Sequence, residues 1–245
     1  MDDGYLERRR AIEAFFVPEN VVSDSSKVTA SPSGHYELEV VLYATKPNSW
    51  SYSRGIVRRL ADGKVIADIK RNYGHFWQAW VKHANGNEYF LCGEDYQGYS
   101  VVNLTEETCG AYFPDKGYQG FGFCWAAVYP SPDGLVLAVD GCIWACPYEI
   151  VLFDFSDPAQ LPLPEIERID GITDPVIGWA DNDTFAFTVS YDIRKLDGAR
   201  YNSLSAEEQD ALDKDPSQIG EVTQRMEWKR SRKSDGIQPA VEQSN

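Results

Sequence analysis

Residues 131–157 read SPDGLVLAVDGCIWACPYEIVLFDFSD, and this stretch decides the fold of the chain. Its Asp133-Gly134 pair predicts a tight turn, because glycine adopts a positive φ without steric cost. Residues 135–139 and 149–155 are two runs rich in β-branched and aromatic side chains, which are typical of strands. We therefore interpret the stretch as the middle of an antiparallel meander.

The turn signal recurs roughly every 50 residues, which indicates an internal repeat. The turn pairs are Ser33-Gly34, Asn85-Gly86, Asp133-Gly134 and Asn182-Asp183. Strand-like runs follow them at 36–43, 55–60 and 65–69, at 88–92, 99–104 and 108–113, at 135–139, 149–155 and 166–169, and at 184–189 and 222–228. Aromatic-containing runs precede the last three turns at 76–82, 123–129 and 176–179. We expect an all-β fold of about four antiparallel units with about four strands each.

The third unit carries a family resemblance. Its Ser131-Pro132-Asp133-Gly134 turn, the apolar strand behind it and the Phe153-Asp154 end of its third strand resemble a blade of a WD40-like β-propeller. The repeat is close to the ~40–50 residues per blade of such families. The Gly-His and Trp-Asp dipeptides of typical WD40 repeats are absent from the corresponding positions. The resemblance therefore implies a propeller-like architecture and no particular family within it.

Three regions are expected: an N-terminal helix and leading strand at 1–26, a β-propeller-like domain at 27–230, and a polar C-terminal tail at 231–245. The helix is predicted over residues 5–16, where apolar side chains share one face and Pro18 ends it. In the last unit, Ser205 and Glu208 form a capping-box signature that predicts an inserted helix from 206 to about 212. Residues 21–29 are predicted to pair with the last unit and close the ring, with an open crescent of sheets as the alternative.

Composition limits the partners. The net charge of −15 argues against a nucleic-acid backbone and favours a basic protein segment or a small cationic ligand. No apolar run approaches the roughly 20 residues that span a bilayer, so no membrane contact is expected. The start of the chain is charged, which predicts a cytoplasmic protein. The five cysteines form no CxxC pair and are expected to be free, buried thiols.

One end of the meander concentrates functional side chains. Loops between second and third strands, together with the crossings between units, carry most of the aromatic and acidic loop residues. From this end we predict the ligand-binding residues Trp50, Tyr73, Tyr96, Trp144, Tyr148 and Tyr191. The turn pairs at the other end are small and plain. Aromatic rings supply rigid contact area and carboxylates select a cation, so the surface is typical of recognition.

We therefore expect a non-enzymatic binding module without cofactor or metal. Packing of the same aromatic rings between the units is the competing interpretation for each residue. The alternative function is a hydrolase or lyase whose carboxylates, with or without a divalent metal, gather at the central mouth. Its candidate catalytic residues are Glu94, Asp95, Asp140, Asp192 and His75. A third hypothesis is a scaffold that oligomerises through the exposed edge of an open ring.

Overall fold

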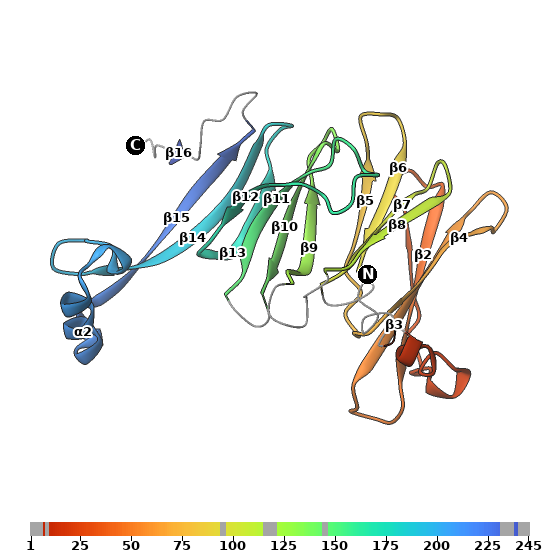
Figure 1. The fold of residues 1–245 in the computed structure, drawn as a ribbon, viewed down its shortest axis with the longest axis horizontal. Helices are drawn as coiled ribbons and strands as arrows, with labels where there is room; N and C mark the ends of the chain where they lie inside the picture. The colour runs from red at the N-terminus through yellow and green to blue at the C-terminus, as the bar shows by residue number, and fades with distance from the viewer. Residues whose placement is uncertain are drawn as a thin grey trace. The chain divides into compact units, whose positions relative to one another are not determined.

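The computed structural model describes residues 7, 10–93, 97–114, 122–143, 147–230 and 238–239. These residues form four antiparallel sheets of four strands each, in which every strand pairs with its sequence neighbour (Figure 1). Each sheet is therefore the four-stranded meander of a propeller blade. The fold is all-β and propeller-like, as predicted.

The strands follow the predicted order. The first sheet contains β1 (Lys27–Ala30), β2 (Tyr36–Ala44), β3 (Ser51–Arg59) and β4 (Val65–Arg71). The second contains β5 (Gln78–Lys82), β6 (Glu88–Cys92), β7 (Tyr99–Asn103) and β8 (Thr108–Tyr112). The third contains β9 (Cys124–Pro130), β10 (Val136–Cys142), β11 (Glu149–Asp154) and β12 (Glu165–Ile169). The fourth contains β13 (Ile172–Trp179), β14 (Thr184–Arg194), β15 (Ile219–Lys229) and β16 (Gln238–Pro239).

The predicted turns have the backbone that glycine permits. Gly34, Gly86 and Gly134 have φ values of 73°, 90° and 69°. In the third turn the Ser131 hydroxyl accepts a hydrogen bond from the backbone N–H of Val136 at 3.0 Å and donates to Asp133 at 2.6 Å. The side chains of this turn therefore help its glycine to fix the hairpin between β9 and β10.

The chain divides into two compact units. Unit 1 comprises Met1–Cys146 and Val151–Glu167 and contains the first and second sheets and most of the third. Unit 2 comprises Pro147–Ile150 and Arg168–Asn245 and contains the fourth sheet.

Unit 1 is built around two apolar clusters. One joins the second and third sheets, where Trp125 stacks on Trp77 at 5.4 Å and on Phe153 at 5.1 Å between ring centroids. The other joins the first and second sheets. Hydrogen bonds tie the same sheets: the Tyr36 hydroxyl donates to the Leu104 carbonyl at 3.0 Å, and a His83 ring nitrogen bonds the Phe155 carbonyl at 2.9 Å.

The prediction that residues 21–29 pair with the last unit is wrong. Lys27–Ala30 pairs with residues 37–40 of β2, and Val21 bridges Tyr43 of the same strand. Five residues (31–35) connect β1 to β2, so this pairing closes a short loop, whereas the predicted one would close almost the whole chain. The partner of β15 comes instead from the C-terminal tail, through Gln238–Pro239.

Both predicted helical regions are present. Glu7 and residues 10–13 are helical, and the short 3-10 helix η1 (Pro18–Asn20) follows. In unit 2 the inserted helix α2 spans Ala206–Lys214, with the predicted capping box between Ser205 and Glu208. Figure 1 shows α2 beyond the ends of β14 and β15. The 3-10 helices η3 (Tyr201–Ser203) and η4 (Pro216–Gln218) flank it. Within the described ranges, no helix combines the length and apolar character needed to cross a membrane.

Candidate ligand-binding site

The candidate site lies on one face of β14 and β15 in unit 2. Side chains alternate between the two faces of a strand, so Phe187, Val189 and Tyr191 share a face of β14. Phe187 stands opposite Met226 of β15 and lies on the same face. The other face carries polar pairs such as Ser190 and Thr223, whose hydroxyls are 2.9 Å apart. The hairpin therefore has one apolar face and one polar face.

A pocket of about 510 Å³ opens on the apolar face. This volume lies within the range of small-molecule sites, roughly 300–1,000 Å³. The pocket will be called the unit-2 pocket. Its apolar lining residues include Phe187, Val189 and Met226 of the hairpin. Its polar lining residues are Asp170, Ser190, Tyr191, Asp192, Arg200 and Asn202, of which Ser190 and Asp192 lie at its edge because their side chains leave β14 from the other face. Asp170 and Gly171 belong to the crossing that leads into β13, so the structure brings together a crossing and a second-to-third loop, as predicted for this end of the sheet.

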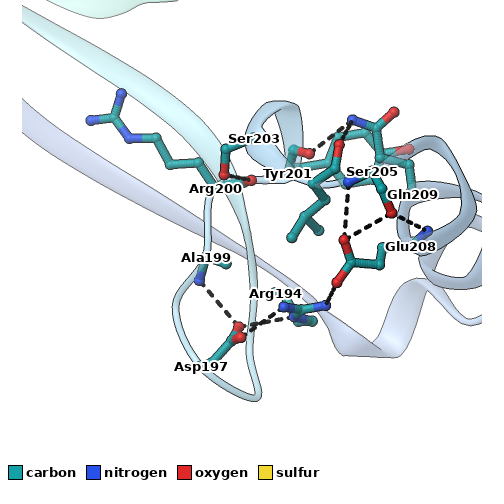
Figure 2. Close-up of polar contacts among 10 residues, drawn as sticks. Arg194, Asp197, Ala199, Arg200, Tyr201, Ser203, Ser205, Glu208 and Gln209 are labelled. Carbon is teal, nitrogen blue, oxygen red and sulfur yellow. Dashed lines mark hydrogen bonds and ion pairs between the residues drawn. The ribbon is translucent and has the colours of Figure 1, made fainter.

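The ring of Tyr191 makes a cation–π contact with the side chain of Arg200. The Arg200 guanidinium lies 4.0 Å from the centroid of the Tyr191 ring, within cation–π distance. Arg200 is exposed, and among the described residues its guanidinium makes no ion pair or side-chain hydrogen bond. Figure 2 shows this side chain extended away from the neighbouring polar network. The face of the Tyr191 ring is therefore a binding position for a positively charged planar group, called the cation seat below. In this structure the protein's own Arg200 occupies it.

A polar network fixes the loop that presents Arg200 (Figure 2). Arg194 donates to Asp197 through two hydrogen bonds of 2.9 and 2.7 Å and to Glu208 of α2 through one of 2.9 Å. Glu208 in turn accepts from the backbone N–H of Ser205 at 3.0 Å. One guanidinium thus joins the hairpin turn to the first turn of the helix.

The charges of this network are stabilised in their ionised forms. The Arg194 guanidinium holds the pKa of Asp197 at about 2 and that of Glu208 at about 2. On the other side of the insertion, the Tyr201 hydroxyl donates to Asp213 at 2.7 Å, and this carboxylate raises the pKa of Tyr201. The frame of the loop is therefore charged and hydrogen-bonded rather than apolar.

The other predicted residues are distributed as follows. In unit 1, Trp50 is 53% exposed, its indole N–H donates to the Asn72 carbonyl at 2.8 Å, and its ring lies 5.6 Å from that of Tyr73. These two predicted ligand residues therefore form one exposed aromatic pair. His75 is exposed and Asp140 is half-buried.

In unit 2, Tyr148 is 50% exposed. Tyr191 and Asp192 both line the unit-2 pocket, but as neighbours on a strand their side chains leave from opposite faces, and Asp192 stands across from Glu221. Tyr96, Trp144, Glu94 and Asp95 lie outside the described residues. No cluster of His, Cys, Asp or Glu suited to a metal ion is found in the described part of the chain.

Sequence reasoning missed Asp170, Arg200 and Asn202. The Asp197-Gly198 pair was the available signal, since a turn there folds the chain back so that Arg200 bridges Ile193 on β14. It also missed a buried Arg71, which is 2% exposed. A Cβ on Gly93 would lie 2.0 Å from the Arg71 guanidinium and 2.7 Å from the Trp77 indole nitrogen, so only glycine fits there.

The turn end of unit 1 carries more polar side chains than predicted. A cavity of about 550 Å³ lies there between the three sheets of the unit, with Ser33, His35, Trp80, Lys82, Glu88 and Ser131 in its lining. Glu88 accepts a hydrogen bond from Ser33 at 2.7 Å and lies 3.5 Å from the His35 ring nitrogen. Polar side chains therefore gather at this end too.

Fold and site together define a propeller-like β protein with an aromatic and charged pocket on its last sheet. No protein-family model matches the chain. Over 146 residues it is 37% identical to an uncharacterized protein of Acanthamoeba polyphaga mimivirus. That match covers 60% of this chain and 57% of the relative, so the chain spans just over half of the relative's length.

Two solved structures share the arrangement distantly. The periplasmic gluconolactonase of Pseudomonas aeruginosa matches over 89% of this chain and 71% of its own, with 10% identity and a TM-score of 0.32. The hydrazine synthase of Kuenenia stuttgartiensis matches over 94% and 68%, with 14% identity and a TM-score of 0.37. At these values neither likeness assigns a function to this chain.

Proposed function

We propose that the protein is a non-enzymatic binding module that recognises a cationic group in the unit-2 pocket. The group would be the lysine or arginine of a basic protein segment, or the charged end of a small cationic molecule. The observation that carries the proposal is the guanidinium of Arg200 on the face of Tyr191. A ligand cation would take the same seat, with Arg200 displaced towards solvent.

The rest of the pocket suits such a ligand. The apolar floor of Phe187, Val189 and Met226 would cover the aliphatic stem of a lysine or arginine side chain, whose charged end stays near water. Asp170, which also lines the pocket, supplies negative charge. The net charge of −15 attracts cations to the protein as a whole.

The test is a calorimetric titration of the full chain with a short glycine–alanine peptide that carries one arginine. We expect Tyr191→Leu to weaken binding about 2- to 30-fold, since an aromatic cation seat is worth about 0.5–2 kcal/mol. Tyr191→Phe is the matched control, because it keeps the ring and should keep the affinity. Asp170→Asn should weaken binding, and Arg200→Ala should strengthen it by emptying the seat.

The proposal fails if the native chain does not bind the peptide, or if Tyr191→Leu binds as well as Tyr191→Phe. A loss of affinity in Arg200→Ala would also contradict it, since Arg200 would then belong to the ligand contacts instead of competing with them.

A further inference from the structure

A register shift in the third sheet places two cysteines opposite each other. Strands β9 and β10 pair in one register up to Asp140, which stands opposite Ala127. The register then shifts, so that Gly141 stands opposite Trp125 and Cys142 stands opposite Cys124. Without this bulge Cys142 would face Trp125, because each step along one antiparallel strand moves one step back along the other.

The strands also approach closely at this point. A Cβ on Gly141 would lie 2.3 Å from the Cys124 carbonyl oxygen and 2.8 Å from the Phe123 ring. Glycine at position 141 therefore lets the end of β10 come close to the start of β9. The bulge and the glycine act together, one setting the register and the other the closeness of the two strand ends.

Directly opposite residues of an antiparallel pair point to the same face, with Cβ atoms about 4.5–5.5 Å apart. A disulfide needs Cβ atoms about 3.5–4.5 Å apart, so a small approach of the two side chains suffices. Neither cysteine is part of a disulfide in the structure, and both residues are half-buried, so they are within reach of a small reagent. The described cysteines elsewhere have other partners across their strands: Cys92 faces Gln78 and Cys109 faces Val102.

We propose that Cys124 and Cys142 are a site of reversible oxidation that closes as a cross-strand disulfide. The oxidant is a low-molecular-weight disulfide such as oxidised glutathione. One cysteine thiolate attacks it, forms a mixed disulfide and releases one glutathione thiolate. The second thiolate then attacks the sulfur of the first cysteine and expels the second glutathione. The two cysteines lose two electrons and two protons, and the oxidised glutathione becomes two reduced molecules.

The position of the pair gives the bond a structural consequence. Cys124 is the first residue of β9 and Cys142 is the last of β10, so the disulfide would clamp the open ends of two paired strands. The segment between β10 and β11 starts directly behind Cys142 and contains the predicted ligand residues Trp144 and Tyr148. Oxidation would therefore bond Cys142, the residue before that segment, to the first residue of β9.

The test equilibrates the full chain in mixtures of reduced and oxidised glutathione, blocks remaining thiols by alkylation and maps the peptides by mass spectrometry. We expect a peptide pair linked through Cys124 and Cys142, with a ratio of linked to reduced protein that, at fixed oxidised glutathione, falls with the square of the reduced glutathione concentration. The square dependence marks an intramolecular disulfide. The exposed Cys109 should instead take up a single glutathione with a linear dependence.

Three variants sharpen the result. Cys142→Ser should leave a glutathione adduct on Cys124, and Cys124→Ser should leave one on Cys142. Cys146→Ser should still form the link, because Cys146 plays no part in it. The proposal is overturned if Cys142 is recovered linked to Cys146. It is equally overturned if Cys124 and Cys142 carry separate adducts or free thiols under conditions that modify Cys109.

Discussion

The second sheet of unit 1 and the fourth sheet of unit 2 share one strand order but bury their strands differently. Every residue of β7 is buried, as are four of the five residues of β6. In β15, by contrast, half-buried and exposed residues alternate, and Trp228 is its buried residue. A strand buried on both faces is covered by neighbours on both sides, whereas alternation leaves one face to water.

The two units are therefore stabilised in different ways. The strands of unit 1 are held by apolar packing between sheets, so substitutions of their buried side chains should be poorly tolerated. The outer half of the β14–β15 hairpin is held by hydrogen bonds and by the Arg194 network, and its apolar face remains open as the unit-2 pocket. The same meander thus supplies a closely packed interior in one unit and the proposed ligand site in the other.

The largest effect is expected from the interior of unit 1. Leu137 is fully buried in the cluster between the second and third sheets. Leu137→Ala should lower the free energy of unfolding by about 2–5 kcal/mol, because it leaves a cavity in close-packed surroundings. The matched control is Leu196→Ala on the 84%-exposed Leu196 of the unit 2 hairpin, with an expected change within about 0.5 kcal/mol. Urea unfolding measures both, and equal losses would refute the contrast.

Two glycines with similar backbones provide the next comparison. Gly134 (φ 69°) and Gly198 (φ 73°) are both left-handed, so alanine costs about 1–2 kcal/mol at each from the backbone alone. At Gly134 the new Cβ would also lie 2.6 Å from the Lys82 carbonyl oxygen, while at Gly198 it meets open space. Gly134→Ala should therefore destabilise more than Gly198→Ala in the same urea experiment. The reverse order would show that the turn in unit 1 can relax.

A smaller and local effect is expected at the cap of α2. Ser205→Ala removes the side-chain acceptor for the Glu208 backbone N–H and should cost about 1 kcal/mol of helix stability. Hydrogen exchange should accelerate in residues 206–214 and stay unchanged in β7. Ser205→Thr keeps a hydroxyl cap and should exchange nearly like the native chain. Faster exchange throughout unit 1 would mean that the insertion is coupled to the interior.

Acid should loosen the same insertion. The ordinary pKa values of Asp197 and Glu208 are 3.8 and 4.5, and both are lowered to about 2 in the folded chain. The stability they contribute is complete above the ordinary values and is lost as the pH falls from about 4.5 towards 2. Hydrogen exchange of residues 195–214 should therefore rise in this range relative to β7. In the Asp197→Asn/Glu208→Gln variant this rise should disappear, and a rise that persists would contradict the assignment.

The sequence was sufficient to predict the sheets, because the signals were local. The Ser131-Pro132-Asp133-Gly134 turn carries its own hydrogen bonds and φ preference, and the strands behind it are short, nearly continuous apolar runs. The capping box of α2 lies within four residues. The pairing of β1 was mispredicted because its four residues are all exposed, so no buried face specified a partner. The bulge at Gly141 was not predicted, because the pattern of apolar residues along a strand does not reveal a bulge. A glycine within a strand is one indication of a bulge.

The site was predictable only in part. Tyr191 and Asp192, which line the unit-2 pocket, were among the predicted residues because the sequence placed them in an aromatic and acidic loop, whereas the structure places them in β14. The contact between Arg200 and Tyr191 depends on how the insertion turns back at Gly198, and no periodicity encodes that turn. The convergence of Asp140 and Asp192 at a central mouth stays a prediction, since the two residues belong to different units.

The most direct test of the cation seat is an NMR titration that follows the side-chain protons of Arg200. In the free protein, the ring current of Tyr191 should shift these protons upfield, because the guanidinium lies over the ring. The arginine peptide should abolish this shift as it takes the seat, and Tyr191→Leu should lack the shift from the start. Peptide binding that leaves the Arg200 signals unchanged would contradict the proposed site.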